Sequence, residues 1–253
     1  VDEVPTLPAD ELLRRIGEYD AIIGRSATRI SDALLRAGTR LRVVGRAGVG
    51  VDNIALDSAT ELGIAVINAP AGNTVAVAEL FFGVIIGLLR HLPRAQSSMH
   101  EGRWERSALM GSELRGKVLG IVGLGRIGSA VATRARAFGM EVVAFDPYIP
   151  DDRFVAMQVR RMPTLESLLS ASQFCSLHVP LTDETKGMIG SAELAMLRRG
   201  AIIANLARGG IIDEPALADA LRAGHVGGAA LDAFSKEPLT GEHAFRGVPN
   251  LLL

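Results

Sequence analysis

The chain has 253 residues and a formal net charge of −1; 48% of its residues are hydrophobic and only 4% are aromatic. The near-neutral charge gives no argument for nucleic acid or an anionic membrane as a partner. A core of Val, Ile, Leu and Ala is typical of helices packed on a parallel sheet. The single cysteine, Cys175, excludes an internal disulfide and favours a reducing, cytoplasmic location. No secretory signal is recognisable, and the most apolar stretch, 80–89, is too short to span a bilayer.

Strand-like and helix-like runs alternate along the chain, which predicts a parallel α/β architecture. Strands are predicted at 20–23, 41–45, 64–68, 118–122, 141–145, 174–179, 201–206, 229–233 and 251–253. Helices are predicted at 31–37, 57–62, 74–89, 130–138, 165–170, 191–197 and 215–223. We therefore expect two doubly wound parallel-sheet domains, residues 1–72 and residues 73–253. The first is expected to be an incomplete flavodoxin-like domain, because the chain enters on a loop and a helix where such a domain begins with a strand.

The most informative stretch, 117–146, predicts in order a strand, a glycine turn, a helix, a glycine that ends the helix, a second strand and an acidic residue. Gly123, Gly125 and Gly128 fit the pattern G-x-G-x-x-G, which is weak alone but specific between a strand and a helix. The first glycine makes the turn, the second lets backbone approach a pyrophosphate, and the third lets the helix pack on the strand. The helix N-terminus offers free N–H groups and a positive dipole to the phosphates. This predicts a Rossmann-type dinucleotide site.

Asp146 bears on the choice of cofactor. It follows Gly128 by 18 residues, close to the ~20 expected for an acid that binds ribose hydroxyls. A carboxylate there repels a 2′-phosphate, and the following Pro147-Tyr148 offers no arginine to bind one. The sequence therefore predicts NAD rather than NADP as the cofactor.

Other polar and glycine-rich segments follow the predicted strands, where ligands of open α/β sheets bind. Arg208 comes after the apolar run 201–204 and before a glycine pair, so it is expected beside a dry cleft. Its planar guanidinium suits a carboxylate ligand. The residues alone leave a second interpretation equally open, in which Arg208 pairs with Asp213 or Glu214 and only caps the sheet end.

A resemblance favours the first interpretation. Segments 205–213 (NLARGGIID) and 231–238 (LDAFSKEP) resemble the two signature motifs of the D-isomer-specific 2-hydroxyacid dehydrogenases. The resemblance extends over essentially the whole chain. Within the family, the chain is most similar to the members that oxidise 3-phosphoglycerate. This finer similarity depends on GRSAT at 24–28, GRAGVGVDN at 45–53, NAPAGNT at 68–74, WER at 104–106 and MGSEL at 110–114.

The resemblance implies roles for residues at the strand ends. Arg208 would bind the substrate carboxylate and polarise the carbonyl, while Glu237 would hydrogen-bond a histidine that acts as general acid and base. Asp232 would receive the nicotinamide carboxamide, and Asp146 the adenosine ribose. The remaining cofactor-binding residues would be Gly123, Gly125, Arg126, Ile127, Gly128, Val179, Leu206 and Ala207.

Substrate contacts are expected from the first domain as well. The resemblance places Arg25, Ser26, Asn73 and the Gly48-Val49-Gly50 backbone at the substrate. Simpler roles remain open, because Ser26 and Thr28 could cap the following helix and Asn73 could cap the helix that opens at Thr74. Arg25, Arg46, Arg103 and Arg106 are candidate cations for a substrate phosphate. No histidine spacing suggests a metal, and none is expected.

The family's catalytic histidine lies a few residues after the strand that begins at Leu251, so we expect it to be absent from this chain. His243 lies too early and is expected at the surface. Because general acid–base help contributes roughly 10²–10⁴ in rate, the 253-residue chain should bind NAD but turn over poorly. Whether a C-terminal regulatory domain follows is left open.

The resemblance implies NAD-dependent oxidation of 3-phospho-D-glycerate to 3-phosphohydroxypyruvate in L-serine biosynthesis. A glyoxylate or hydroxypyruvate reductase, or another D-2-hydroxyacid dehydrogenase, is the alternative within the same reaction class. A non-catalytic, NAD-sensing binding protein of the corepressor type is an alternative of another class, since fold does not settle function. The helix 74–89 is apolar on most faces and predicts a homodimer or homotetramer.

Overall fold

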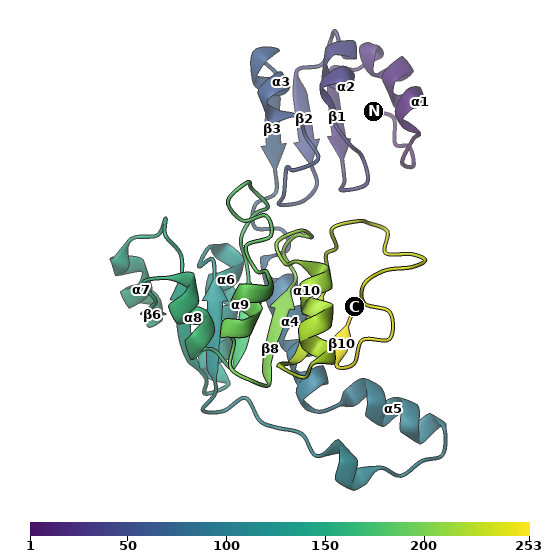
Figure 1. The fold of residues 1–253 in the computed structure, drawn as a ribbon. Coiled ribbons are helices and arrows are strands. Elements are labelled where there is room, and N and C mark those ends of the chain that lie inside the picture. The colour runs from purple at the N-terminus through teal and green to yellow at the C-terminus, as the bar shows by residue number, and fades with distance from the viewer. The chain divides into compact units, whose positions relative to one another are not determined.

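The computed structural model describes residues 1–253. The chain divides into two compact units, Val1–Asn73 and Thr74–Leu253, each with its own parallel sheet (Figure 1). The parallel α/β fold class predicted from the alternating pattern is confirmed.

The first unit contains a three-stranded sheet in the order β1-β2-β3, with every pair parallel. Its elements are α1 (Ala9–Arg15), the short 3-10 helix η1 (Ile16–Glu18), β1 (Ala21–Gly24), α2 (Asp32–Ala37), β2 (Val43–Arg46), α3 (Leu56–Glu61) and β3 (Ala65–Asn68). Ile22, Val44 and Val66 are in register and pack with the helices in one apolar cluster. On the opposite face, the side chains of Ile23 and Ile67 are 80% and 60% exposed.

The second unit contains a seven-stranded parallel sheet in the order β10-β9-β8-β7-β4-β5-β6. Its strands are β4 (Val118–Val122), β5 (Glu141–Phe145), β6 (Arg160–Arg161), β7 (Phe174–Leu177), β8 (Ala201–Asn205), β9 (Val226–Leu231) and β10 (Leu251–Leu252). Its helices are α4 (Thr74–Leu89), α5 (Leu92–His100), η2 (Arg106–Leu109), α6 (Arg126–Ala137), α7 (Asp151–Met157), α8 (Leu165–Ala171), α9 (Ser191–Met196) and α10 (Glu214–Arg222).

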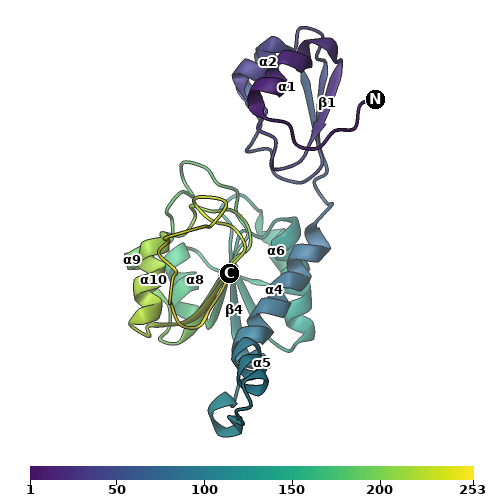
Figure 2. The same cartoon turned by 90° about the vertical axis from the view of Figure 1, so that its right-hand side faces the viewer.

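Helices cover both faces of this larger sheet. Figure 2 shows α4 and α6 on one side and α8, α9 and α10 on the other. Each side has a separate apolar cluster, one with Phe81 of α4 and Val131 of α6, the other with Leu169 of α8 and Leu217 of α10. Cys175 lies on β7, is fully buried between β4 and β8, and burial raises the pKa of its thiol to about 12. The two-sided covering explains why the central strands are almost continuously apolar.

Most predicted elements lie within a few residues of the observed ones, but some were missed. The helix predicted at 130–138 begins at Arg126, because the glycine turn continues directly into helical backbone. α5, α7 and the two-residue strand β6 were not predicted, because their sequences are short and show no clear periodicity. By length and composition, none of the single helices could cross a membrane; α4 and α5 qualify only as a pair, across a 59° bend.

Candidate functional site

The turn between β4 and α6 requires glycine at two of its positions, Gly123 and Gly128. Gly123 has φ of +90°, and a Cβ atom there would lie 2.7 Å from the carbonyl oxygen of His178. A Cβ on Gly128 would lie 2.1 Å from the carbonyl oxygen of Gly123. A Cβ on Gly125, by contrast, would meet no atom within 4 Å. The first and third glycines therefore allow close packing, and the second presents bare backbone on an open side of the turn.

The N-terminus of α6 has no side-chain cap. Gly125 is the N-cap residue, and the first turn begins with Arg126 and Ile127. The N–H groups of a first helical turn have no partner within the helix, and the helix dipole adds partial positive charge there. An uncapped terminus beside an open glycine backbone fits the pyrophosphate of a dinucleotide.

Asp146 lies directly after β5 and joins the glycine turn to the next loop. One carboxylate oxygen accepts the Leu124 N–H at 2.9 Å, and the other accepts the Tyr148 N–H at 3.0 Å. The residue is only 9% exposed. Each carboxylate oxygen can accept a second hydrogen bond, so both remain able to accept from hydroxyl groups. A held, buried negative charge at this position fits a ribose diol better than a 2′-phosphate.

The end of β7 forms another wall of the glycine turn. A Cβ on Gly123 would lie 2.9 Å from Cγ1 of Val179, so this predicted cofactor-binding side chain lies against the turn. Next to it, burial lowers the pKa of His178 to about 4, so the imidazole is neutral at pH 7. Its Nε2 lies 2.8 Å from Oγ of Ser176, and its ring packs edge-on to Phe81. His178 therefore belongs to the packing of β7 against α4.

A buried asparagine shapes the turn that carries Arg208. The Asn205 side chain donates to the Arg208 carbonyl at 2.8 Å and accepts the Ala207 N–H at 3.2 Å. The half-buried Arg208 in turn donates from Nη1 to the Ala207 carbonyl at 2.7 Å. Leu206 is 7% exposed and belongs to the apolar core. Asn205 was not among the predicted site residues, although an asparagine that ends a wholly apolar strand was an available signal.

The loops after β8 and β9 are in close contact. A Cβ on Gly209 would lie 1.9 Å from the carbonyl oxygen of Phe234, so the two signature segments meet backbone to backbone. Glu237 accepts the Phe234 N–H at 3.1 Å and so holds its own loop. Partial burial, and secondarily the Glu237 carboxylate, raise the pKa of Asp232 above its ordinary value. Asp232 and Glu237 therefore interact electrostatically.

These features share one edge of the larger sheet. They follow β9, β8, β7, β4 and β5, which are consecutive in the sheet, so their loops are neighbours. The structure thus brings together the predicted cofactor-binding residues of this unit and the predicted catalytic pair. They are Gly123, Gly125, Arg126, Ile127, Gly128, Asp146, Val179, Leu206, Ala207, Arg208, Asp232 and Glu237.

The predicted substrate residues of the first unit lie in loops after its strands. Arg25 and Ser26 occupy the turn after β1, whose backbone is fixed by Asn53. The Asn53 amide donates to the Thr28 carbonyl at 2.6 Å and to the Arg25 carbonyl at 3.3 Å. The turn is therefore held by a side chain that the predicted site did not include, although it lies within GRAGVGVDN.

The loop after β2 contains Gly48, Val49 and Gly50. Asn68 at the end of β3 donates to the Val49 carbonyl at 2.7 Å, which ties this loop to the neighbouring strand. A Cβ on Gly48 would lie 2.6 Å from Nη1 of Arg46, so the guanidinium lies over this glycine. Nη1 of Arg46 donates to the Ala47 carbonyl at 2.9 Å, while its buried Nε has no hydrogen-bond partner.

The structure bears on three further expectations. Neither Ser26 nor Thr28 caps the following helix, because the N-cap of α2 is Ser31, whose Oγ accepts the Leu34 N–H. Arg103, a candidate cation for a substrate phosphate, is paired with both Glu101 and Glu105. His243 is half-buried beside Phe245, not at the surface, and its Nδ1 is buried.

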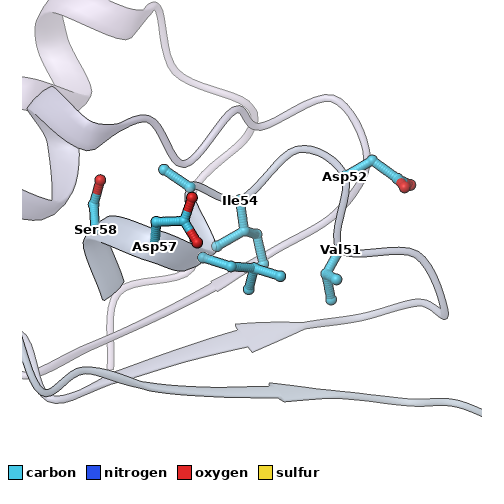
Figure 3. Close-up of a pocket in the computed structure, with 7 residues that line it drawn as sticks. Val51, Asp52, Ile54, Asp57 and Ser58 are labelled. Atoms are coloured by element: carbon cyan, nitrogen blue, oxygen red, sulfur yellow. The ribbon is translucent and has the colours of Figure 1, made fainter. Parts of the chain in front are cut away.

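One hollow of the first unit lies beside the predicted loop, not on it. A pocket of about 450 Å³ is lined by Val51, Asp52, Ile54, Asp57 and Ser58, together with Ala55 and Leu56 (Figure 3). It directly follows Gly50 in sequence but includes none of the predicted substrate residues. Its two carboxylates make it unsuitable for an anionic substrate.

Comparisons with known proteins agree with this geometry. Residues 82–253 match the model of the D-isomer specific 2-hydroxyacid dehydrogenase, NAD binding domain. D-3-phosphoglycerate dehydrogenase of Bacillus subtilis is 51% identical over 87% of this chain and 42% of its own length. The enzyme of that name from Methanocaldococcus jannaschii is 45% identical over 93% of this chain and 45% of its own length. The chain thus spans less than half the length of these curated relatives.

Comparison with solved structures indicates the same family. The TT0316 protein from Thermus thermophilus superposes with a TM-score of 0.90 at 36% identity, covering 98% of this chain and 79% of that one. A glyoxylate reductase from Paecilomyes thermophila gives 0.88 at 32% identity, covering 96% and 76%. NAD, the cofactor predicted from the sequence, is the cofactor of the matched domain. The chain belongs to the D-isomer-specific 2-hydroxyacid dehydrogenase family.

Proposed function

We propose that the protein oxidises 3-phospho-D-glycerate to 3-phosphohydroxypyruvate with NAD, a reaction of L-serine biosynthesis. The observation that carries the proposal is the shared edge of the larger sheet. There an uncapped helix terminus, a buried carboxylate and an arginine follow neighbouring strands. Relatives that are 42–51% identical are named D-3-phosphoglycerate dehydrogenase, which supports this substrate over other 2-hydroxy acids.

The residues that would hold NAD are those whose geometry fits it. The open backbone of the glycine turn and the first amides of α6 bind the pyrophosphate, and Asp146 binds the adenosine ribose. Asp232 receives the nicotinamide carboxamide. When bound, NAD accepts a hydride from the substrate carbon.

Arg208 and Glu237 have different tasks. The Arg208 guanidinium binds the substrate carboxylate through paired N–H donors and polarises the reacting carbonyl. Glu237 is a positioning residue, which orients and raises the basicity of the histidine that serves this family as general acid and base. In the first unit, Arg25, Ser26, Asn73 and the Gly48–Gly50 backbone contact the substrate, and Arg25 and Arg46 offer charge to its phosphate.

The test uses the full-length protein and measures NADH consumption with 3-phosphohydroxypyruvate and hydroxypyruvate in parallel. We expect a strong preference for the phosphorylated acid. Equal or reversed preference would replace the proposal with a glyoxylate or hydroxypyruvate reductase, which the similarity to the Paecilomyes enzyme makes the second candidate. NAD binding without turnover of either acid would favour an NAD-sensing binding protein.

We further propose a cytoplasmic homodimer, assembled through the second unit. Large apolar side chains are exposed on α4, on α5 and in the segment after them. The exposed fractions are Leu80 41%, Leu92 53%, Met99 55%, Trp104 77% and Met110 83%. Light scattering should give twice the chain mass, and Trp104→Arg should reduce it to the monomer; a monomeric parent protein would contradict the proposal.

A further inference from the structure

A pocket at the opposite edge of the larger sheet is not used by the proposed reaction. It lies where β4, β7 and β8 begin, whereas the glycine turn, Asp146 and Arg208 follow the strands' other ends. The three strands are adjacent in the sheet. A strand of five residues spans roughly 15 Å, so the two edges are separate places.

The backbone around the pocket is fixed by hydrogen bonds. Gln173 accepts the Val118 N–H on its side-chain oxygen at 3.1 Å and donates its own N–H to the Val118 carbonyl at 3.0 Å. Its carbonyl also accepts the Ile202 N–H at 3.0 Å, so one residue links the starts of all three strands. The turn before β8 is closed by Ala201 N–H donating to the Arg198 carbonyl at 2.8 Å. The pocket is therefore present before any ligand arrives.

Three cationic residues line this pocket, and no acidic residue does. They are Lys117, Arg198 and Arg199, with Ser112 and Gln173 as further polar groups. None of the three forms an ion pair; Arg198 donates from Nε to the Ser170 carbonyl at 3.1 Å. Glu141, which begins the neighbouring strand β5, is already paired with Arg160 at 2.8 Å. Three positively charged residues therefore line one hollow that has no carboxylate among its lining residues, which favours an anion as the ligand.

The size of the pocket limits the ligand. Its volume is about 190 Å³, below the ~300–1,000 Å³ typical of drug-sized ligands, so it suits a small molecule or ion. Guanidinium groups match the oxygens of a phosphate in pairs, and the lysine adds a point charge. We propose that this pocket binds a small phosphate-bearing anion at the amino edge of the sheet. The inference is independent of the proposed dehydrogenase activity.

Binding of inorganic phosphate to the 253-residue chain tests the proposal, by calorimetry against chloride at equal ionic strength. Arg199→Gln and Lys117→Gln should each weaken binding about tenfold, since each removes a charge-assisted hydrogen bond. Neither should lower the melting temperature in phosphate-free buffer, because each removes one of the repelling charges. Arg153→Gln, at an exposed arginine of α7 that likewise forms no ion pair, is the matched control and should leave phosphate binding unchanged.

A second variant separates the two edges of the sheet. Arg126→Gln alters the start of α6 and should not affect this binding. Loss of phosphate binding in Arg126→Gln, with full binding in Arg199→Gln, would place the anion at the glycine turn and overturn the proposal. Absence of phosphate binding, or equal binding by all variants, would overturn it as well. Tighter binding of glycerol 3-phosphate than of phosphate would identify the ligand as an ester and not the free ion.

Discussion

At Gly128 the backbone of α6 meets the turn before it at a distance that leaves no room for a side chain. The same is true where Gly209 meets Phe234, and both contacts lie at the proposed cofactor and substrate edge. The identity of single residues therefore decides the geometry of this edge more directly than the composition of its strands does.

Gly128→Ala should destabilise the fold by about 1–3 kcal/mol, because its Cβ would lie 2.1 Å from the Gly123 carbonyl oxygen and must displace the turn. NAD binding should fall with it. Gly83→Ala is the control, since a Cβ there meets nothing and alanine favours helix by about 0.5–1 kcal/mol. Urea unfolding measures both. Equal stability of the two variants would contradict the packing described for Gly128.

Glu237→Gln should lower the pKa of Asp232, because it removes the neighbouring negative charge while leaving the burial that is the larger cause. Carboxyl titration by NMR measures this shift. Since the native pKa of Asp232 is the higher one, the native state holds the proton more tightly. Ionisation of Asp232 therefore lowers the free energy of unfolding as the pH rises from below the pKa of Asp232 in the unfolded state through its pKa in the native state. The variant should lessen that loss; an unchanged titration would show that the two carboxylates do not interact.

At the scale of elements, strand ends matter more than strand interiors. The strands supply a rigid frame, and the chemistry is expected in the loops that follow them. Several of those loops are shaped by an amide side chain at a strand end. Asn205 at the end of β8 shapes the loop after β8, and Asn68 at the end of β3 holds the loop after β2. The amide of asparagine can donate one hydrogen bond and accept another, which suits a turn in which a backbone N–H and a backbone carbonyl both need a partner.

Asn205→Ala should destabilise the protein by about 1–3 kcal/mol, because it leaves the Ala207 N–H and the Arg208 carbonyl without their partner. The turn that carries Arg208 should also loosen, so affinity for a substrate carboxylate should fall more than affinity for NAD. Asn205→Asp should be worse, because it keeps the acceptor but buries a charge facing a carbonyl oxygen. Chemical denaturation and ligand titration give the two quantities; wild-type behaviour of Asn205→Ala would rule out this role.

Much of the element order could be predicted because periodicity and glycine punctuation are local signals. The glycine turn, α4 and β5 follow from short runs of sequence. The contacts that shape the site could not be predicted, because they join residues that are distant in the sequence. Gly209 contacts Phe234, and Asn53 holds the turn at Arg25, only in the folded chain. Likewise, the pairing of Arg103 with two glutamates depends on a loop whose conformation no periodicity reveals.

At the scale of the whole molecule, the two units have separate cores. The buried cluster of the first unit draws only on residues before Asn73, and both clusters of the second unit draw only on residues after it. The first cluster is much the smaller, so this unit should open more readily.

Leu35→Ala should cost about 2–5 kcal/mol, because the side chain is 1% exposed in the first cluster. Hydrogen exchange should accelerate throughout the first unit while the second keeps its protection. Leu169→Ala, fully buried in the second unit, is the matched control and should give the reverse pattern. Loss of protection in both units from either change would show that they unfold together.

The reactivity of the Cys175 thiol reports how often the larger sheet opens. As the only thiol, buried in the middle of the central sheet and kept protonated by its raised pKa, it cannot react with a disulfide reagent while β4, β7 and β8 stay paired. The colour released by such a reagent should therefore appear at the rate at which the larger sheet opens. A burst of labelling in native buffer would mean that the sheet opens far more often than its packing suggests.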